Sequence, residues 1–291
     1  MEKHNRINWK RGLLITPEIL IASDNYHISE RNLLGAILAS RSYGILPDSE
    51  FYLEKEIVSN CLTIKNLNCF AITKEGTMIG IPKALAFKKE LPLHETIGNE
   101  FYVILSVNQK GMASEDDNKP FIYPDYQLSL KKTSETVDCG IPLLMIKNDS
   151  HWEIVRNYIP PSISLNSTEG LLRKFADTKN LINQIIEKYP NNTPEFFQIN
   201  LLKLELNDFS PQKSPEEWTL LMKKFCWFFY SHLKNENKIE GSRLMHGFIN
   251  EPFNPDNIEK TIQGGFDSFA EIDKIFDIQP VEEIEEIEIK L

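Results

Sequence analysis

The spacing of apolar residues changes once along the 291-residue chain, at Pro160-Pro161. Before this pair, apolar and polar residues alternate in short stretches, which indicates strands with one face toward a core. After it, apolar residues recur every three or four positions, which indicates amphipathic helices. Two consecutive prolines neither continue a strand ladder nor stand inside a helix. The sequence therefore predicts an α+β chain, with a β domain over residues 1–161 and a helical domain over 162–278.

The first half carries the signals of short antiparallel strands. Residues 57–64 and 67–73 alternate apolar with polar side chains, and Lys74-Glu75-Gly76 supplies a tight turn into a strand over 77–81. Residues 101–107 are apolar on both faces, as in a strand that is covered on both sides. Such spacing is typical of an antiparallel sandwich or barrel. The inward candidates are Leu62, Ile64, Phe70 and Ile72, and further strands are expected over 121–130, 141–147 and 151–158.

Helix start signals, each a capping residue followed by proline and an acid, recur along the chain. Thr16-Pro17-Glu18 predicts an early helix that runs to about Ser40. In the second half, three similar starts predict a bundle of about four helices, namely Thr193-Pro194-Glu195, Ser214-Pro215-Glu216-Glu217 and Asn254-Pro255-Asp256. Ser214 and Glu217 also fit a capping box. The helix before these starts carries a heptad-spaced seam made of Leu171, Phe175, Thr178, Ile182, Ile185 and Tyr189.

The acidity of the chain belongs to its C-terminal segment. The net charge is −10, and residues 251–291 hold twelve Asp or Glu against three Lys, a net of −9, which leaves −1 for the rest. This balance argues against nucleic-acid binding through a basic face. Residues 279–291 form an acidic tail, either solvated or able to add a strand to a partner's sheet edge through Ile284, Ile287 and Ile289.

The chain has no apolar run near the ~18 residues that span a membrane and no apolar stretch behind its N-terminal charges. We therefore expect a cytoplasmic protein without direct membrane insertion.

The residues that could carry chemistry do not form a catalytic pattern. Asp149-Ser150-His151 has the residue types of a hydrolase triad, but consecutive strand residues point to opposite faces. Neither a phosphate-binding glycine loop nor a metal-ligand spacing occurs, so no catalytic residue, cofactor or metal is expected. The six histidines are scattered and are expected at the surface or partly packed: His4, His27, His94, His151, His232 and His246.

Two other groups of residues suggest packing rather than chemistry. The cysteines fall in apolar stretches and are expected to be small buried residues: Cys61, Cys69, Cys139 and Cys226. An aromatic patch at Phe225, Trp227, Phe228 and Phe229 indicates a core or a subunit interface. Together these features suit an assembly or adaptor protein better than an enzyme.

The opening of the chain, residues 7–18, resembles the start of TssK, the baseplate adaptor of the type VI secretion system. The matching residues are Trp9, Gly12, Leu13 and Pro17. The chain departs from the family at Arg11, where an acid is common, and at Ile19-Leu20, where His-Phe is common. Residues 44–82, 214–233 and 253–256 also resemble parts of the family in the same order.

The resemblance implies a β-sandwich shoulder over residues 1–161, a helical neck over 162–278 and a non-enzymatic, homotrimeric baseplate subunit. It implies that the shoulder meets the wedge proteins TssF and TssG, while the neck drives trimerisation by burying its seam against symmetry mates. The family usually has a C-terminal head that contacts the membrane-anchor complex. The printed sequence ends where that head would begin, so we expect a shortened, divergent member whose contact with the anchor complex is left open.

Two alternatives remain open from the sequence. A phage-tail adaptor or a receptor-binding-like protein belongs to the same structural class but to another machine. A hydrolase with an unusual site would require a buried, convergent polar pocket, and the sequence predicts none.

Overall fold

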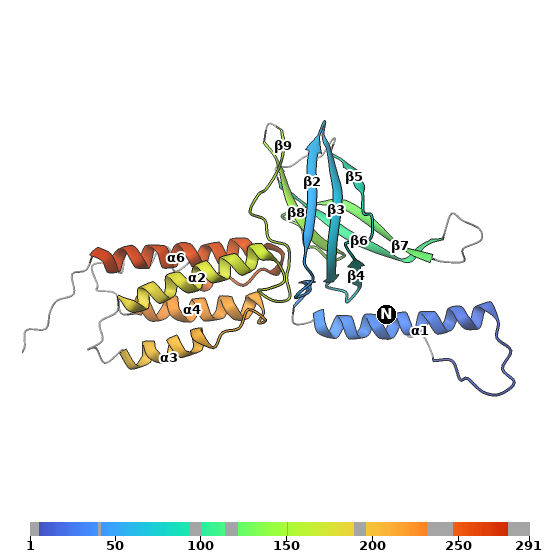
Figure 1. Cartoon of the computed structure of the whole chain (residues 1–291), viewed down its shortest axis with the longest axis horizontal. Coiled ribbons are helices and arrows are strands. Elements are labelled where there is room, and N and C mark those ends of the chain that lie inside the picture. The colour runs from blue at the N-terminus through green and yellow to red at the C-terminus, as the bar shows by residue number, and fades with distance from the viewer. Residues whose placement is uncertain are drawn as a thin grey trace, which may run out of the picture. The chain divides into compact units, whose positions relative to one another are not determined.

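The computed structural model describes residues 6–39, 42–93, 100–113, 122–149, 151–188, 196–231 and 247–278. The described chain forms two compact units (Figure 1). The first, called here the β unit, contains the described residues up to Gly170 together with Pro255–Asn257. The second, called the helical unit, contains the described residues of 171–254 and those from Ile258 onward. The architecture is the predicted α+β arrangement of an early helix, antiparallel sheets and then helices.

The β unit begins with helix α1, Pro17–Ala39, as the cap at Thr16 predicts. Its strands pair antiparallel in two sheets. In the first sheet, β3 is central and pairs with β1, β2, β4 and β5. The second sheet has the order β7-β6-β8-β9. The strands are β1 Gly44–Ile45, β2 Tyr52–Val58, β3 Cys61–Ile72, β4 Met78–Ile81, β5 Lys89–Pro92, β6 Glu100–Ala113, β7 Ile122–Lys132, β8 Ile141–Asn148 and β9 Trp152–Ile154.

The two sheets pack face to face around shared apolar clusters, as a sandwich requires. One cluster joins Ile64 and Leu67 of β3 to Leu105 of β6, and another joins Leu62 of β3 to Val103 of β6. Strand β6 is buried on both faces from Phe101 to Leu105, as its apolar run predicts, while Ser106 and Val107 are only partly buried.

One inward assignment is wrong because β3 contains a bulge. Leu62, Ile64 and Ile72 are buried as predicted, but the ring of Phe70 is exposed. The pairing with β2 skips Lys65, because Glu54 faces Asn66 while Lys55 faces Ile64. One extra residue exchanges the two faces of a strand, so Leu67, Cys69 and Ala71 join the core between the sheets after the bulge. Ile72 is buried outside that cluster.

The helical unit consists of amphipathic helices around an aromatic core. The α4 cap is the predicted capping box, in which the Glu217 amide donates to Ser214 Oγ at 3.2 Å and the Ser214 amide donates to Glu217 Oε2 at 2.9 Å. Trp218, Phe225 and Phe229 of α4 and Phe269 of α6 are fully buried. The helices are α2 Glu169–Glu187, α3 Phe196–Asn207, α4 Pro215–Ser231 and α6 Ile258–Ile278, and the short 3-10 helix Pro255–Asn257 precedes α6.

The predicted seam of α2 exists, but the chain buries it in its own bundle. Leu171, Phe175, Thr178, Ile182 and Ile185 are all buried within the single chain. The ring of Phe175 lies 4.7 Å from that of Trp218, centroid to centroid, so α4 of the same bundle covers the seam. Tyr189, the last predicted member, lies outside the described residues. An isolated helical unit has to bury one stripe of each helix in its own core, and α2 uses its seam for that purpose.

Candidate interaction surfaces

The two described residues of the possible triad, Asp149 and His151, each interact with a different neighbour. His151 Nε2 lies 2.7 Å from Glu153 Oε1, and Lys147 Nζ donates to Asp149 Oδ2 at 3.2 Å. Ser150 lies outside the described residues. His27 and His151 are exposed, and the other four histidines fall outside the described ranges. Among the described residues, no group of three or more His, Cys, Asp or Glu side chains could hold a metal ion.

The cysteine prediction is right at two positions and wrong at one. Cys69 and Cys226 are buried, and Cys61 is partly buried. Cys139 is exposed in the loop between β7 and β8, where its thiol donates to Glu75 Oε1 at 3.0 Å. This hydrogen bond and the nearby negative charge raise the pKa of the Cys139 thiol. The apolar residues that follow Cys139 belong to the next strand, so they do not cover the thiol.

Helix α1 is held on the β unit by an unusually close glycine contact. A Cβ atom placed on Gly35 would lie 2.0 Å from the carbonyl oxygen of Gly76, in the β3–β4 turn. Gly76 has φ of +83°, a conformation that favours glycine, and its own Cβ would meet the backbone of α1. At its start the helix is capped by Thr16, and the hydrogen bond from this side chain lowers the pKa of Glu18. Only glycine at both positions allows the two backbones to come so close.

Apart from this contact, α1 leaves large apolar side chains exposed. Leu33 and Leu34 lie four and three residues before Ile37, and Leu20 lies about four turns before Leu34 on the same side. Leu34 is 62 % exposed. We call Leu20, Leu33, Leu34 and Ile37 the α1 surface. The residues before the helix add to the exposed apolar area at Trp9, Leu14 and Ile15. A concentration of this kind is typical of an interaction site.

A second exposed apolar area lies on the helical unit. Phe197, Leu201 and Leu204 follow the i, i+4, i+7 spacing along α3, and Leu220 and Trp227 follow the i, i+7 spacing along α4. Phe197 is 70 % exposed and Trp227 is 62 % exposed. We call these five residues the α3–α4 surface.

An ion pair shows that the two rows of this surface are neighbours. Lys224 Nζ lies 2.6 Å from Glu205 Oε1. Glu205 adjoins Leu204, and Lys224 lies one turn from both Leu220 and Trp227. The sequence contains both rows, but the stronger period of α2 drew the interface prediction to a seam that the chain buries in its own bundle.

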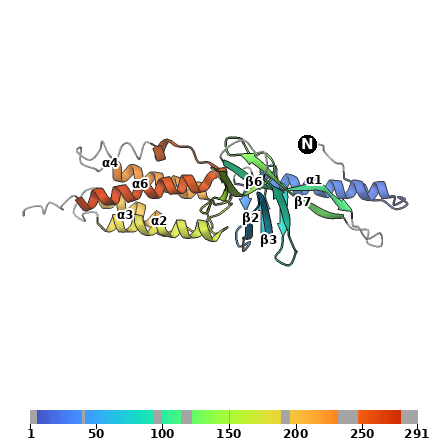
Figure 2. The same ribbon diagram turned by 90° about the horizontal axis from the view of Figure 1, so that it is seen from above.

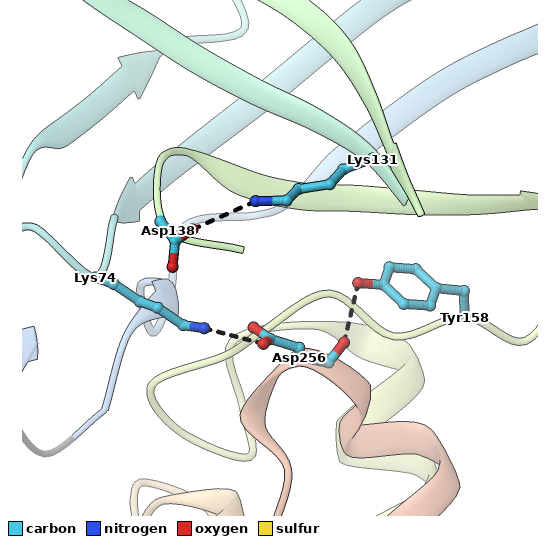
Figure 3. Close-up of polar contacts among 5 residues, drawn as sticks. All are labelled: Lys74, Lys131, Asp138, Tyr158 and Asp256. Carbon is cyan, nitrogen blue, oxygen red and sulfur yellow. Dashed lines mark hydrogen bonds and ion pairs between the residues drawn. The ribbon is translucent and has the colours of Figure 1, made fainter. Parts of the chain in front are cut away.

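A polar cluster holds the segment Pro255–Asn257 on the β unit (Figure 3). Lys74 Nζ donates to Asp256 Oδ2 at 2.9 Å, and the same ammonium group lies 4.8 Å from the centre of the Tyr43 ring. The Tyr158 hydroxyl donates to the Asp256 carbonyl oxygen at 3.4 Å. Burial raises the pKa of Asp256 to about 6 and lowers that of Lys74. Asp256 lies in the family-like stretch 253–256, and its visible role is to fix this segment.

These features define a class of protein: an α+β protein with an antiparallel sandwich, a helical bundle and two exposed apolar surfaces. Solved structures of TssK from the type VI secretion system have the same fold. A crystal structure of TssK is 12 % identical and covers 93 % of this chain and 69 % of its own, with a TM-score of 0.63. TssK from EAEC bound to nanobody nb18 is 10 % identical and covers 87 % of this chain and 68 % of its own, with a TM-score of 0.61.

One chain of the type VI secretion system TssK–TssF–TssG baseplate subcomplex also has a similar structure to this protein. It covers 94 % of this chain and 99 % of its own at 12 % identity, with a TM-score of 0.63. No family model matches the sequence, and no curated protein matches it significantly. At these identities the likeness establishes a divergent TssK-like fold. None of the described helices is long and apolar enough to cross a membrane.

Proposed function

We propose that this protein is a structural subunit of a type VI secretion system baseplate, is not an enzyme, and works in the cytoplasm. The observation that carries the proposal is the likeness to TssK structures, which extends over both the sandwich and the bundle. The two exposed apolar surfaces support it, because each needs a protein partner to remove it from water. In this proposal residues 1–161 are the shoulder and 162–278 the neck.

The α3–α4 surface is the proposed trimer contact. The α2 seam is already covered within the chain, so the remaining apolar rows of the bundle are the ones that a second copy can bury. In a trimer with a threefold axis, each copy would bury the same five side chains. Large exposed aromatic residues such as Phe197 and Trp227 are the kind of residue that anchors such contacts.

The α1 surface is the proposed contact with the wedge proteins TssF and TssG. It belongs to the β unit, the part that corresponds to the shoulder, and the Gly35–Gly76 contact fixes the helix that carries it. The chain of the TssK–TssF–TssG subcomplex that resembles this protein supports the choice of partners. A fixed helix can present its apolar side chains without an ordering cost at the moment of binding.

The experiment is co-expression of the full chain with TssF-type and TssG-type proteins from the same genome. The wild-type chain should capture both proteins. Leu33→Glu with Leu34→Glu should reduce capture by about tenfold or more, because two charges would enter an apolar contact. Leu201→Glu with Leu204→Glu is the matched control on the helical unit. This variant should still capture both wedge proteins, because each dissociated subunit keeps its α1 surface. Equal capture by the wild type and the α1 variant would contradict the assignment of the α1 surface.

A further inference from the structure

A groove on the β unit is lined by an edge strand from each sheet, β2 from the first and β9 from the second. Each of these two strands pairs with a described strand on one side only. The groove has a volume of about 890 Å³, which is sufficient for a short extended peptide. All its lining residues belong to the β unit, and the acidic tail, residues 279–291, lies outside the described residues and is no part of this site.

The floor of the groove is the rim of an apolar core cluster. Trp152 of β9 belongs to this cluster, and its ring lies 5.7 Å from that of Phe101, centroid to centroid. Ile57 of β2 and Ile154 of β9 are partly buried and pack against the same cluster. Because the core holds these side chains in place, the floor offers a fixed apolar surface to a strand that lies along β2.

The edge of β2 carries a lysine in its apolar row. Lys55 pairs with the buried Ile64 of β3, so it lies on the core-facing side of the sheet, between Leu53 and Ile57. Neighbouring protein atoms partly desolvate its ammonium group and lower its pKa, although the side chain as a whole is exposed. No ion pair joins Lys55 to another residue of the described ranges. A charge on the inner row of a sheet edge discourages pairing with ordinary strands, because an added apolar strand would remove the charge from water without a counter-ion.

The other charges of the lining favour an acid beside this lysine. The groove is lined by three cations and two acids, Glu100 and Glu153, and Glu153 lies 3.5 Å from Lys147. Arg156 adds its charge on the β9 side of the groove. A carboxylate that enters the groove next to Lys55 therefore meets an excess of positive charge.

The outer face of β2 has the opposite charge. Glu54 and Glu56 alternate with Lys55 along the strand and so share the outer face, where Lys65 Nζ of β3 lies 2.6 Å from Glu56 Oε2. An added strand with acids on this face would place like charges side by side, whereas lysine or threonine would be favourable there. The two faces of β2 therefore specify a strand with apolar, acidic and apolar residues on its inner face and with basic or hydroxyl residues on its outer face.

We propose that the free edge of β2 binds an extended segment of another protein that carries this pattern, and that the segment extends the first sheet as an added strand. The acid of the segment faces Lys55, and its two apolar residues face Leu53 and Ile57. A second copy of this chain does not fit as the occupant, because the inner row of its own β2 offers no acid. Lys55 makes the edge selective, since it rejects a strand without an acid at this position and pairs with a strand that supplies one.

The test uses a synthetic heptapeptide and hydrogen exchange by mass spectrometry on the full-length chain. The peptide is Thr-Ile-Lys-Glu-Lys-Ile-Thr with blocked ends, and its symmetric pattern suits a parallel and an antiparallel strand equally. At about 1 mM it should slow exchange over residues 52–58 by about twofold or more and leave residues 89–92 unchanged. The same peptide with lysine at its centre should give no protection, although the chain has a net charge of −10. No protection by the glutamate peptide, or equal protection by the two peptides, overturns the proposal.

A charge swap completes the test. Lys55→Glu should weaken binding of the glutamate peptide by about tenfold, because two carboxylates would face each other, and this variant should now prefer the lysine peptide. Lys89→Glu is the matched control, since Lys89 pairs with the same Ile64 on the other side of β3. It should change binding of the glutamate peptide by less than about twofold. Equal weakening by the two variants, or a Lys55→Glu chain that still prefers the glutamate peptide, also overturns the proposal. Exchange in β6 should be the same in all variants, which checks that the β unit folds.

Discussion

Replacing Leu201 and Leu204 by glutamate should convert the proposed trimer to a monomer without unfolding the chain. Leu201 is 52 % exposed and Leu204 60 % exposed in the single chain. Full burial of a leucine contributes about 2 kcal/mol, so covering the exposed half of each contributes about 1 kcal/mol. Two leucines in each of three subunits therefore contribute about 6 kcal/mol to the assembly. Each glutamate would also have to be desolvated in the contact, at a further cost of about 1–3 kcal/mol or more.

Light scattering at micromolar concentration measures the effect. The wild type should have a mass near three times 33.7 kDa, about 101 kDa, and the variant a mass near 33.7 kDa. The loss of about 6 kcal/mol or more corresponds to at least about four powers of ten in the assembly constant, which is enough to dissociate the trimer. The same substitutions at Leu33 and Leu34 are the control and should leave the mass near 101 kDa. A wild-type monomer, or a variant that stays trimeric, would refute the reasoning.

Three further predictions follow from individual contacts. Gly35→Ala should release α1 from the β unit, seen as faster hydrogen exchange in α1, whereas Gly170→Ala should not, because its Cβ would meet nothing closer than 4.0 Å. The raised pKa of Asp256, about 6 against 3.8, makes the native state bind an extra proton between these values, so the free energy of unfolding should fall as pH rises from about 4 to 6. Asp256→Asn should lose that slope in denaturant titrations, and an unchanged slope would contradict the assignment. Ser214→Ala should lower the free energy of unfolding by about 1 kcal/mol, since it removes the cap of α4, and no loss would mean that the cap is dispensable.

Local signals predicted most of the fold because they act over a few residues. The cap at Thr16, the capping box at Ser214 and the turn at Gly76 each satisfy backbone groups with their own neighbours. Such signals do not depend on the rest of the chain, so they can be recognised in the sequence alone. The change of apolar period at Pro160 predicted the order of sheets and helices for the same reason.

Two of the incorrect predictions, the burial of Phe70 and the exposure of the α2 seam, depend on contacts between residues far apart in the sequence. The bulge at Lys65 exchanged the faces of β3 and exposed Phe70, and no property of Lys65 announces a bulge in the sequence. The spacing around Phe175 correctly predicted an apolar stripe on α2. Such a stripe does not determine whether the same chain or another copy covers it. Trp218 covers it here, and this depends on how the bundle closes.

The candidate surfaces were harder to predict than the fold because exposure is a property of the packed chain. Phe197, Leu201 and Leu204 have a helical spacing, but so do the buried residues of α2. The Gly35–Gly76 contact joins two segments 41 residues apart, and neither glycine stands in a motif that predicts the other.

The central claim, that this chain is a baseplate subunit, is tested most directly by purifying the tagged full-length protein from the cells that encode it and identifying what remains bound. Quantitative mass spectrometry should recover TssF-type and TssG-type proteins in fixed ratios to the chain. The Leu33→Glu, Leu34→Glu variant should lose them while keeping the mass of its own oligomer. Recovery of the chain without any wedge protein, or an equal recovery with the variant, would contradict the account.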